Sequence, residues 1–384
     1  MNSAIRQYES LLRLAPKARR RLPLAELYFA VGRRMALKTL LDESEALFPR
    51  SSVWPHQQAL LALHEGDSAL ALRKMRMAFA RGKSSPLLRE LVSLQLAADR
   101  ADEALTALQS HSDLALAEPI FQALQGRALV MRGEEDAGFR QYDAALRQVD
   151  SLAAFMSVAD QLRLGVGAVK AVEMATVVFG ASPPTWAQLG LAAVEVDGEA
   201  YAEALVRLDA LAGAAATMDE PQRLHYERAR AVALHHVGRG AESETAYGRW
   251  RSLAPTDPAA HAGLGRLLIE ELNRPEEAAK LLRGIWTARP NDPVLLDVLG
   301  LALWRVGENA EAKQLLEERL TLRPGAEANL FLAEIALEEG RRATAVARLN
   351  SAREIAEQSN NDSHTLDAVD RLLSELKGDG DPNP

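Results

Sequence analysis

A repeat of similar length recurs along most of the chain, and it limits the possible folds more than any other feature of the sequence. Each clear copy has a glycine preceded by leucine, then an alanine and a leucine, as in Gly190 with Ala204 and Leu208, Gly265 with Ala278 and Leu282, and Gly300 with Ala312 and Leu316. Alignment on these residues places repeat starts near residues 18, 52, 85, 119, 152, 183, 224, 258, 293 and 326, so the nine intervals are 34, 33, 34, 33, 31, 41, 34, 35 and 33 residues. Because units of such an array contact mainly their neighbours, the repeat predicts a solenoid that grows linearly.

Composition and turn residues predict that each repeat is a pair of antiparallel helices, A and B. Of the 384 residues 48% are hydrophobic but only 5% are aromatic, and the prominent alanine and leucine are strong helix formers. Glycine, which readily adopts a left-handed backbone, recurs where helix A would end, at Gly66, Gly133, Gly238, Gly307 and Gly340. Proline, which cannot continue a helix, follows helix B at Pro49, Pro255, Pro290 and Pro324. The fold class predicted is therefore all-α.

Small residues at two positions of the repeat predict how the helices pack. The eighth position holds Gly190, Gly265, Gly300 and Ala333, which we expect to let helix A approach its partner helix B closely. The twentieth position, on helix B, holds Ala71, Ala104, Ala204, Ala278, Ala312 and Ala345. A small residue on each helix removes the side chains that would otherwise hold the two backbones apart.

The window from Trp186 through Leu189-Gly190 to Ala204 and Leu208 resembles the tetratricopeptide repeat (TPR) at its landmark positions. The resemblance, which is to TPR proteins of the bacterial type, extends over residues 18–358. It implies a right-handed superhelical solenoid of antiparallel helix pairs, about ten TPR units plus terminal helices. It also implies that the protein binds a partner and does not catalyse a reaction.

The repeat divides the chain into segments. Residues 1–17 are predicted to form an N-terminal packing helix or half of a repeat, with Ile5, Tyr8, Leu11 and Leu12 on one face of residues 3–14. Two TPR blocks, 18–212 and 224–358, are joined by a connecting loop, 213–223, that fills the 41-residue interval and could act as a hinge. Residues 359–377 are predicted to form a capping helix, and 378–384 a disordered tail. A start inside a longer chain is the alternative to a natural packing helix at residues 1–17.

Charge and motifs exclude several functions. The formal net charge is −8 and the pI about 5.6, which argues against binding nucleic acid through a basic surface. The chain has no cysteine, and no stretch has the length and apolarity of a membrane-spanning helix. No phosphate-binding loop, metal-binding histidine motif or nucleophile motif occurs, so we expect no cofactor, no metal and no enzymatic activity. His235 and His236 are adjacent and therefore point about 100° apart on a helix, which does not suit a metal.

The resemblance implies a binding surface. In TPR proteins, positions 2, 5, 9, 12 and 13 of helix A line the concave face, and here they include Arg89, Asp160, His225 and Asp297. The residues predicted to bind a partner are Arg228, His235, His236, Arg266, Trp304 and Arg305. Arginine and tryptophan are common in binding hot spots, although Glu270 and Asp297 could pair with some of these arginines. We expect an acidic peptide or protein segment with an apolar anchor, bound more tightly below about pH 6.5, where histidine protonates.

The function predicted from the sequence is therefore that of a non-catalytic scaffold or adaptor that holds a protein or peptide in its groove. The alternative is an accessory TPR subunit of a bacterial envelope assembly, such as exopolysaccharide export or protein sorting. The first thirty residues contain no apolar signal-peptide segment, since Arg19, Arg20 and Arg21 interrupt them, so a cytoplasmic protein is expected. A chain truncated at its N-terminus would instead be compatible with the periplasm.

Overall fold

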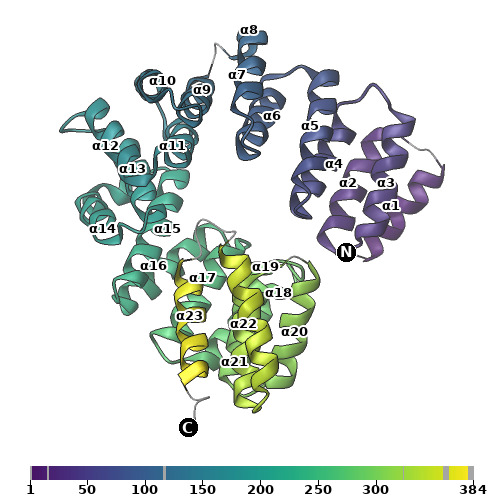
Figure 1. Ribbon diagram of the computed structural model, residues 1–384, viewed down its shortest axis with the longest axis vertical. Coiled ribbons are helices and arrows are strands. Elements are labelled where there is room, and N and C mark those ends of the chain that lie inside the picture. Colours follow the sequence, from purple (N-terminus) through teal and green to yellow (C-terminus); the bar gives the residue numbers. More distant parts are fainter. Residues whose placement is uncertain (1, 15–16, 116–117, 323, 358–362, 379–384) are drawn as a thin grey trace. The chain divides into compact units, whose positions relative to one another are not determined.

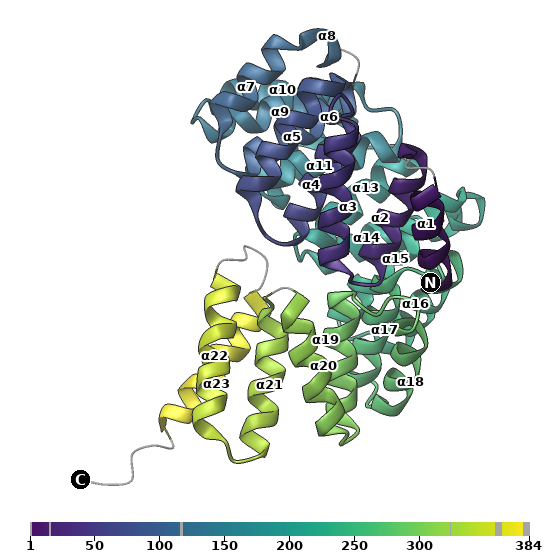
Figure 2. The same ribbon diagram turned by 90° about the vertical axis from the view of Figure 1, so that its right-hand side faces the viewer.

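The computed structural model describes residues 2–14, 17–115, 118–322, 324–357 and 363–378, and the regular secondary structure in these ranges is helical, without strands (Figures 1 and 2). The prediction of an all-α protein is confirmed. In the same ranges no helix combines the length and the apolarity needed to cross a membrane. Residues 379–384, most of the predicted disordered tail, lie outside the description.

The described residues contain ten helix pairs. The A helices are α2 (Ala18–Ala30), α4 (Val53–His64), α6 (Ser85–Ala97), α9 (Pro119–Met131), α11 (Leu152–Val166), α13 (Thr185–Asp197), α15 (Glu220–His236), α17 (Pro258–Glu270), α19 (Pro293–Arg305) and α21 (Ala326–Glu338). The B helices are α3 (Arg34–Leu47), α5 (Ser68–Gly82), α7 (Ala101–Ser110), α10 (Glu135–Gln148), α12 (Ala168–Phe179), α14 (Tyr201–Ala210), α16 (Gly240–Leu253), α18 (Pro275–Trp286), α20 (Asn309–Leu322) and α22 (Arg342–Glu357). The remaining helices are α1 (Asn2–Leu14), the short α8 (Ser112–Ala115), the 3₁₀ helix η1 (Ala212–Thr217) and α23 (Ser363–Gly378).

The predicted repeat starts agree closely with the A helices. Seven of the ten starts coincide with the first residue of an A helix, and the others differ by one, two and four residues. The largest difference is at α15, which begins at Glu220 instead of residue 224. Asp219 accepts a hydrogen bond from the Gln222 backbone N–H, and Pro221 lies in the first turn, so a capped turn precedes the repeat landmark.

Contacts divide the chain into two compact units, residues 1–253 with α1 to α16 and residues 254–384 with α17 to α23. The predicted connecting loop, 213–223, lies inside the first unit. It is not a loop throughout, because η1 covers its first part, Met218 is buried and α15 begins at Glu220. Whether this segment acts as a hinge stays a prediction.

The small residues lie where helices meet. The six alanines at the twentieth position have no exposed surface, and a Cβ atom added to Gly300 would lie 2.5 Å from Leu316 on the partner helix α20. Gly265 meets Leu282 of its partner α18 in the same way. The prediction is wrong for Gly190, whose added Cβ would lie 2.1 Å from the Phe155 ring. Phe155 is on α11, the preceding A helix, so this glycine makes room for an aromatic ring between repeats.

The turns between helices A and B require a left-handed residue. The five predicted glycines all have positive φ, between 71° and 85°. In three other repeats Asp99, Glu199 and Asn273 take this conformation, with φ of 56°, 61° and 51°. A side chain makes the left-handed backbone unfavourable, since Cβ approaches the following carbonyl.

The two terminal helices cover the ends of their units. Ile5 of α1 is fully buried against α2, Tyr8 and Leu12 are half-buried, and Leu11 is exposed. At the other end α23 packs on α22 and α21 through Val369 and Leu373. Both predicted terminal helices are therefore present as amphipathic helices.

We predict that Glu199→Gly stabilises unit 1 by about 1 kcal/mol, because glycine removes the cost of a left-handed side chain. The measurement is the shift in the midpoint of urea unfolding, followed by circular dichroism. Glu199→Ala is the matched control, since it removes the same charge but keeps a Cβ atom. An equal gain from alanine would mean that charge, and not backbone strain, limits stability at this turn.

Candidate partner-binding surface

The six predicted binding residues divide equally between the two units. Arg228, His235 and His236 lie on α15 in unit 1, while Arg266 lies on α17 and Trp304 and Arg305 lie on α19 in unit 2. Their surroundings differ, and only some of them offer an exposed functional group.

Arg228 lies at a pocket between the fifth, sixth and seventh repeats. The pocket has a volume of about 280 Å³ and is lined by Met156, Ala193, Val196, Asp197, His225, Arg228, Ala229 and Val232. The Arg228 side chain is exposed, and its guanidinium lies 5.8 Å from the centre of the buried Trp250 ring, a cation–π contact. An apolar pocket therefore has an accessible cation at its edge.

Two titratable side chains share this pocket with Arg228. Burial lowers the pKa of His225, and the positive charge of Arg228 lowers it further. Burial raises the pKa of Asp197, while Arg163 and Arg228 oppose that rise. The expectation that histidine protonates near its usual pKa is therefore wrong for His225, which takes up its proton at lower pH.

The adjacent histidines were expected to point about 100° apart, but their rings lie 5.4 Å from centre to centre and stack at 28°. His235 is only 9% exposed, and its ring lies 6.4 Å from that of Tyr247 on α16, edge to face. His236 is exposed and stacks on Tyr201 of α14 with 4.2 Å between ring centres. Of the two, His236 is the one with a surface that a partner could reach.

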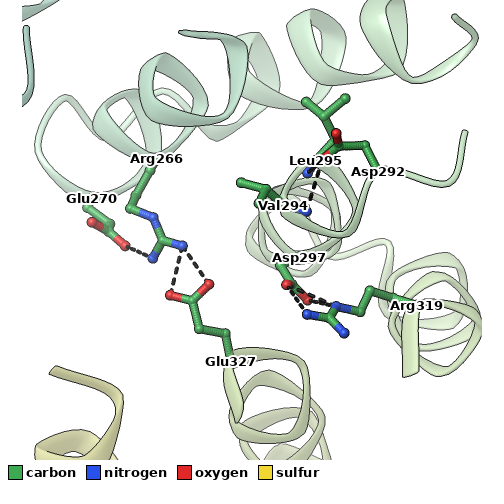
Figure 3. Close-up of polar contacts among 8 residues, drawn as sticks. All are labelled: Arg266, Glu270, Asp292, Val294, Leu295, Asp297, Arg319 and Glu327. Carbon is green, nitrogen blue, oxygen red and sulfur yellow. Dashed lines mark hydrogen bonds and ion pairs between the residues drawn. The ribbon is translucent and has the colours of Figure 1, made fainter. Parts of the chain in front are cut away.

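Arg266 in unit 2 is held by two carboxylates (Figure 3). Its Nη2 atom lies 2.9 Å from both carboxylate oxygens of Glu327 on α21, and its Nη1 atom lies 3.3 Å from Glu270 Oε1. Burial lowers the pKa of Arg266, but the two carboxylates outweigh it and the net shift is upward. The pairing with Glu270 is confirmed, whereas the stronger partner Glu327 was not predicted.

Asp297 does not line a groove and does not pair with the predicted arginines. It is 5% exposed and accepts three hydrogen bonds of 2.8 to 3.0 Å from Arg319 of α20, which is itself 4% exposed (Figure 3). Burial raises the pKa of Asp297 to about 6, although Arg319 opposes this shift. The Arg319 guanidinium lies against Gly325, where an added Cβ would be 2.5 Å from Cζ. This ion pair is part of the packing between α19 and α20.

Trp304 is mostly buried, and the guanidinium of Arg305 stacks on its ring. The Trp304 side chain is 8% exposed, and its indole N–H donates a hydrogen bond of 2.7 Å to Glu338 of α21. The exposed Arg305 guanidinium lies 4.3 Å from the centre of the Trp304 ring. Arginine stacked on a ring keeps its N–H donors available for a carboxylate. Arg228 and Arg305 are thus both exposed arginines placed by tryptophan rings.

The architecture defines the class of protein. Ten antiparallel helix pairs, with small residues at their contacts and a left-handed residue at most A–B turns, make this chain a helical-repeat protein of TPR-like units. In the ranges described, no group of three or more His, Cys, Asp or Glu side chains is placed to hold a metal ion.

Comparisons with protein families and with curated proteins find no match. Similar solved structures include a tetratricopeptide repeat protein from Parabacteroides merdae, 14% identical, covering 65% of this chain and 98% of that one with a TM-score of 0.49. The APC/C hetero-tetramer Cut9–Hcn1 is 14% identical, covering 96% of this chain and 80% of that one with a TM-score of 0.42. Yeast Tom70 is 14% identical, covering 99% and 94% with a TM-score of 0.36. At such identities and TM-scores the similarities carry no argument, and the class depends on this chain's own helices.

We predict that Arg228→Gln raises the pKa of His225 but leaves it below about 6.5, because burial is the larger cause of the shift. The measurement is an NMR titration of the imidazole signals. Since the unfolded chain takes up this proton at higher pH than the folded chain, His225 also makes the protein less stable as the pH falls through about 6.5. The control is Arg223→Gln, which removes a charge from an exposed position of the same helix and should leave the midpoint of the His225 titration unchanged.

We further predict that Arg319→Met lowers the free energy of unfolding of unit 2 by about 3 to 5 kcal/mol, because it leaves the Asp297 carboxylate buried without its partner. The double variant Asp297→Leu with Arg319→Met should lose far less, since no charge is then buried. Urea unfolding measures both. Arg283→Met, which breaks exposed ion pairs with Glu308 and Glu311 on the same unit, should cost about 1 kcal/mol or less. Equal losses at Arg283 and Arg319 would show that burial of the pair has no special role.

Proposed function

We propose that this protein is a non-catalytic scaffold or adaptor whose A helices bind an acidic segment of a partner protein that carries an apolar anchor residue. The observation that supports this most is the pocket at Arg228. It combines apolar walls from Met156, Val196 and Val232 with an exposed cation held over Trp250. Arginine with aromatic support is typical of interface hot spots.

The pocket is large enough for one side chain of a partner. Its volume of about 280 Å³ is close to the lower end of the range of about 300 to 1,000 Å³ usual for sites that enclose small molecules. An anchor side chain in the pocket would bring the neighbouring residues of the partner close to Arg228. An acidic residue there would gain an ion pair with Arg228 and would also counter the smaller of the two causes that lower the pKa of His225, the positive charge of Arg228.

Arg305 in unit 2 is a second exposed arginine with aromatic support. Arg266 is a poorer candidate than the sequence predicted, because Glu327 and Glu270 already neutralise its charge. Trp304 contributes mainly by placing Arg305, since its own ring is largely covered. The structure therefore supports Arg228, His236 and Arg305 more strongly as contact residues than Arg266, His235 and Trp304.

The test is affinity capture of partners from the native host, followed by binding measurements with Arg228→Glu and Arg305→Glu. We expect at least one of these variants to bind the captured partner at least about fivefold more weakly, and the wild-type affinity to fall as salt is raised. Arg266→Glu and Trp304→Ala are unsuitable, because the first would place three carboxylates together and the second would open a space beneath Arg305.

Arg140→Glu is the matched control, since Arg140 is an exposed arginine on a B helix, α10. If both Arg228→Glu and Arg305→Glu bind like Arg140→Glu, the proposed surface is wrong. A partner that binds equally well at low and at high salt would contradict its acidic character.

A further inference from the structure

Exposed apolar side chains gather on the A helices of the first two repeats, away from the predicted binding residues. Phe29 of α2 is 48% exposed, and Leu60 and Leu63 of α4 are 41% and 38% exposed. The Phe29 ring lies 4.9 Å from that of His64, edge to face, so α2 and α4 present these side chains side by side. We refer to Phe29, Leu60 and Leu63 as the apolar strip.

Two pockets meet at Leu60 in the middle of this strip. The first, of about 260 Å³, is lined by Phe29, Leu37 and Leu41 on the side of α2 and α3. The second, of about 480 Å³, lies on the side of α6 and α9. It is lined by Leu63 of α4, Leu94 of α6 and Ile120 of α9. It also reaches α11, so A helices of four successive repeats, α4, α6, α9 and α11, contribute to it. Leu60 contributes to both pockets.

Each pocket has one charged side chain without a partner in the part of the chain that the structure describes, and the two have opposite signs. Glu26 lines the first pocket and Arg89 the second, and both are exposed. Within the ranges that the structure describes, neither has an ion-pair or hydrogen-bond partner for its side chain. The other charged groups of the second pocket are already engaged, because Glu90 contacts His56 at 2.7 Å and Asp160 contacts Arg163 at 3.0 Å. A bound segment would therefore meet one available negative charge and one available positive charge.

We propose that the apolar strip binds an amphipathic helix of a protein partner, with a basic residue towards Glu26 and an acidic residue towards Arg89. The parts of the two pockets that adjoin α4 lie on either side of it, so we take their separation as about one helix spacing, about 8 to 10 Å. Residues seven apart on a helix are about 10.5 Å apart along its axis, which matches this spacing. Same-face residues of an extended strand are about 6.7 or 13 Å apart, which fits less well.

This inference depends on the proposed function in one respect, namely that the protein binds other proteins. It concerns a different surface, because none of the residues of the apolar strip lines the Arg228 pocket. Its partner also has a different charge pattern, with both signs at opposite ends instead of an acidic segment. The two proposals can therefore fail separately.

The test uses three pools of synthetic helical peptides, each about 15 residues long. In all pools the positions i, i+3, i+4 and i+7 vary among Leu, Ile, Met and Phe, and the remaining positions are Ala and Gln. The pools differ only at the ends, which carry one Lys and one Asp, two Asp, or two Lys. Each pool is selected on the full chain, and dissociation constants of the enriched peptides are measured by fluorescence anisotropy.

We expect wild type to prefer the pool with one Lys and one Asp by about threefold to fivefold, the effect of one exposed ion pair. Glu26→Arg should shift the preference to peptides with two Asp, and Arg89→Glu to peptides with two Lys. These swaps do not depend on which way round the helix binds. Leu60→Glu should weaken every selected peptide at least about tenfold, whereas Val206→Glu, at a 75% exposed valine of α14, should have no effect.

Enrichment of no pool, a preference that the charge variants do not change, or equal binding by Leu60→Glu and wild type would each overturn the proposal. Circular dichroism of Leu60→Glu checks its folding, and the charge swaps at Glu26 and Arg89 decide the matter if that variant unfolds. Arg228→Glu should leave the affinities of the peptides with one Lys and one Asp unchanged, whereas a two-Asp peptide that it weakens is bound at the Arg228 pocket and not at the apolar strip. If the pools fail while a captured partner is still sensitive to Arg228→Glu, the proposed function stands and the apolar strip is wrong.

Discussion

The close approach of helices A and B at small residues is the contact on which the rest of this structure depends. Alanine at the twentieth position is completely buried in six repeats, and Gly265 and Gly300 face leucines of their partner helices at distances that leave no room for a methyl group. A single helix pair of this size cannot bury enough apolar surface to fold alone, so stability comes from stacking one pair on the next. The small residues set the distance within each pair and therefore the surface that it offers to its neighbours.

In unit 1 this arrangement leaves one face of several A helices exposed, and that face carries candidate binding groups, whereas in α19 of unit 2 every residue from Leu295 to Trp304 is buried. In unit 1 the face changes in character along the chain, from exposed Phe29 and Leu60 to charged residues such as Asp160 and Arg228. The backbone is similar in these repeats, so the difference comes from side chains alone. Two unlike surfaces on one repeat fold would allow a scaffold to hold two unlike partners, which is consistent with the function proposed.

The sequence predicted the helices far better than the contacts between them. Repeat landmarks identified ten helix pairs and placed the first residue of seven A helices correctly, because periodicity and turn glycines are local signals. Partners of individual side chains were mostly missed. Arg266 binds Glu327, which is 61 residues away, and Trp304 binds Glu338, which is 34 residues away. Nothing in the repeat pattern specifies which of several nearby carboxylates accepts the bond. Gly190 was assigned to the wrong neighbour for the same reason, since its place in the repeat does not reveal the ring of Phe155.

The most direct test of the central claim is hydrogen–deuterium exchange of the full chain with and without a captured partner. The account holds that B helices maintain the repeat and A helices bind. It predicts that a partner slows exchange in peptides from A helices, either α15 or α2 and α4 according to the surface that it occupies, while exchange in the B helices α10, α12 and α14 stays the same. Protection confined to the B helices would contradict the account and would place the binding surface on the opposite side of the repeats.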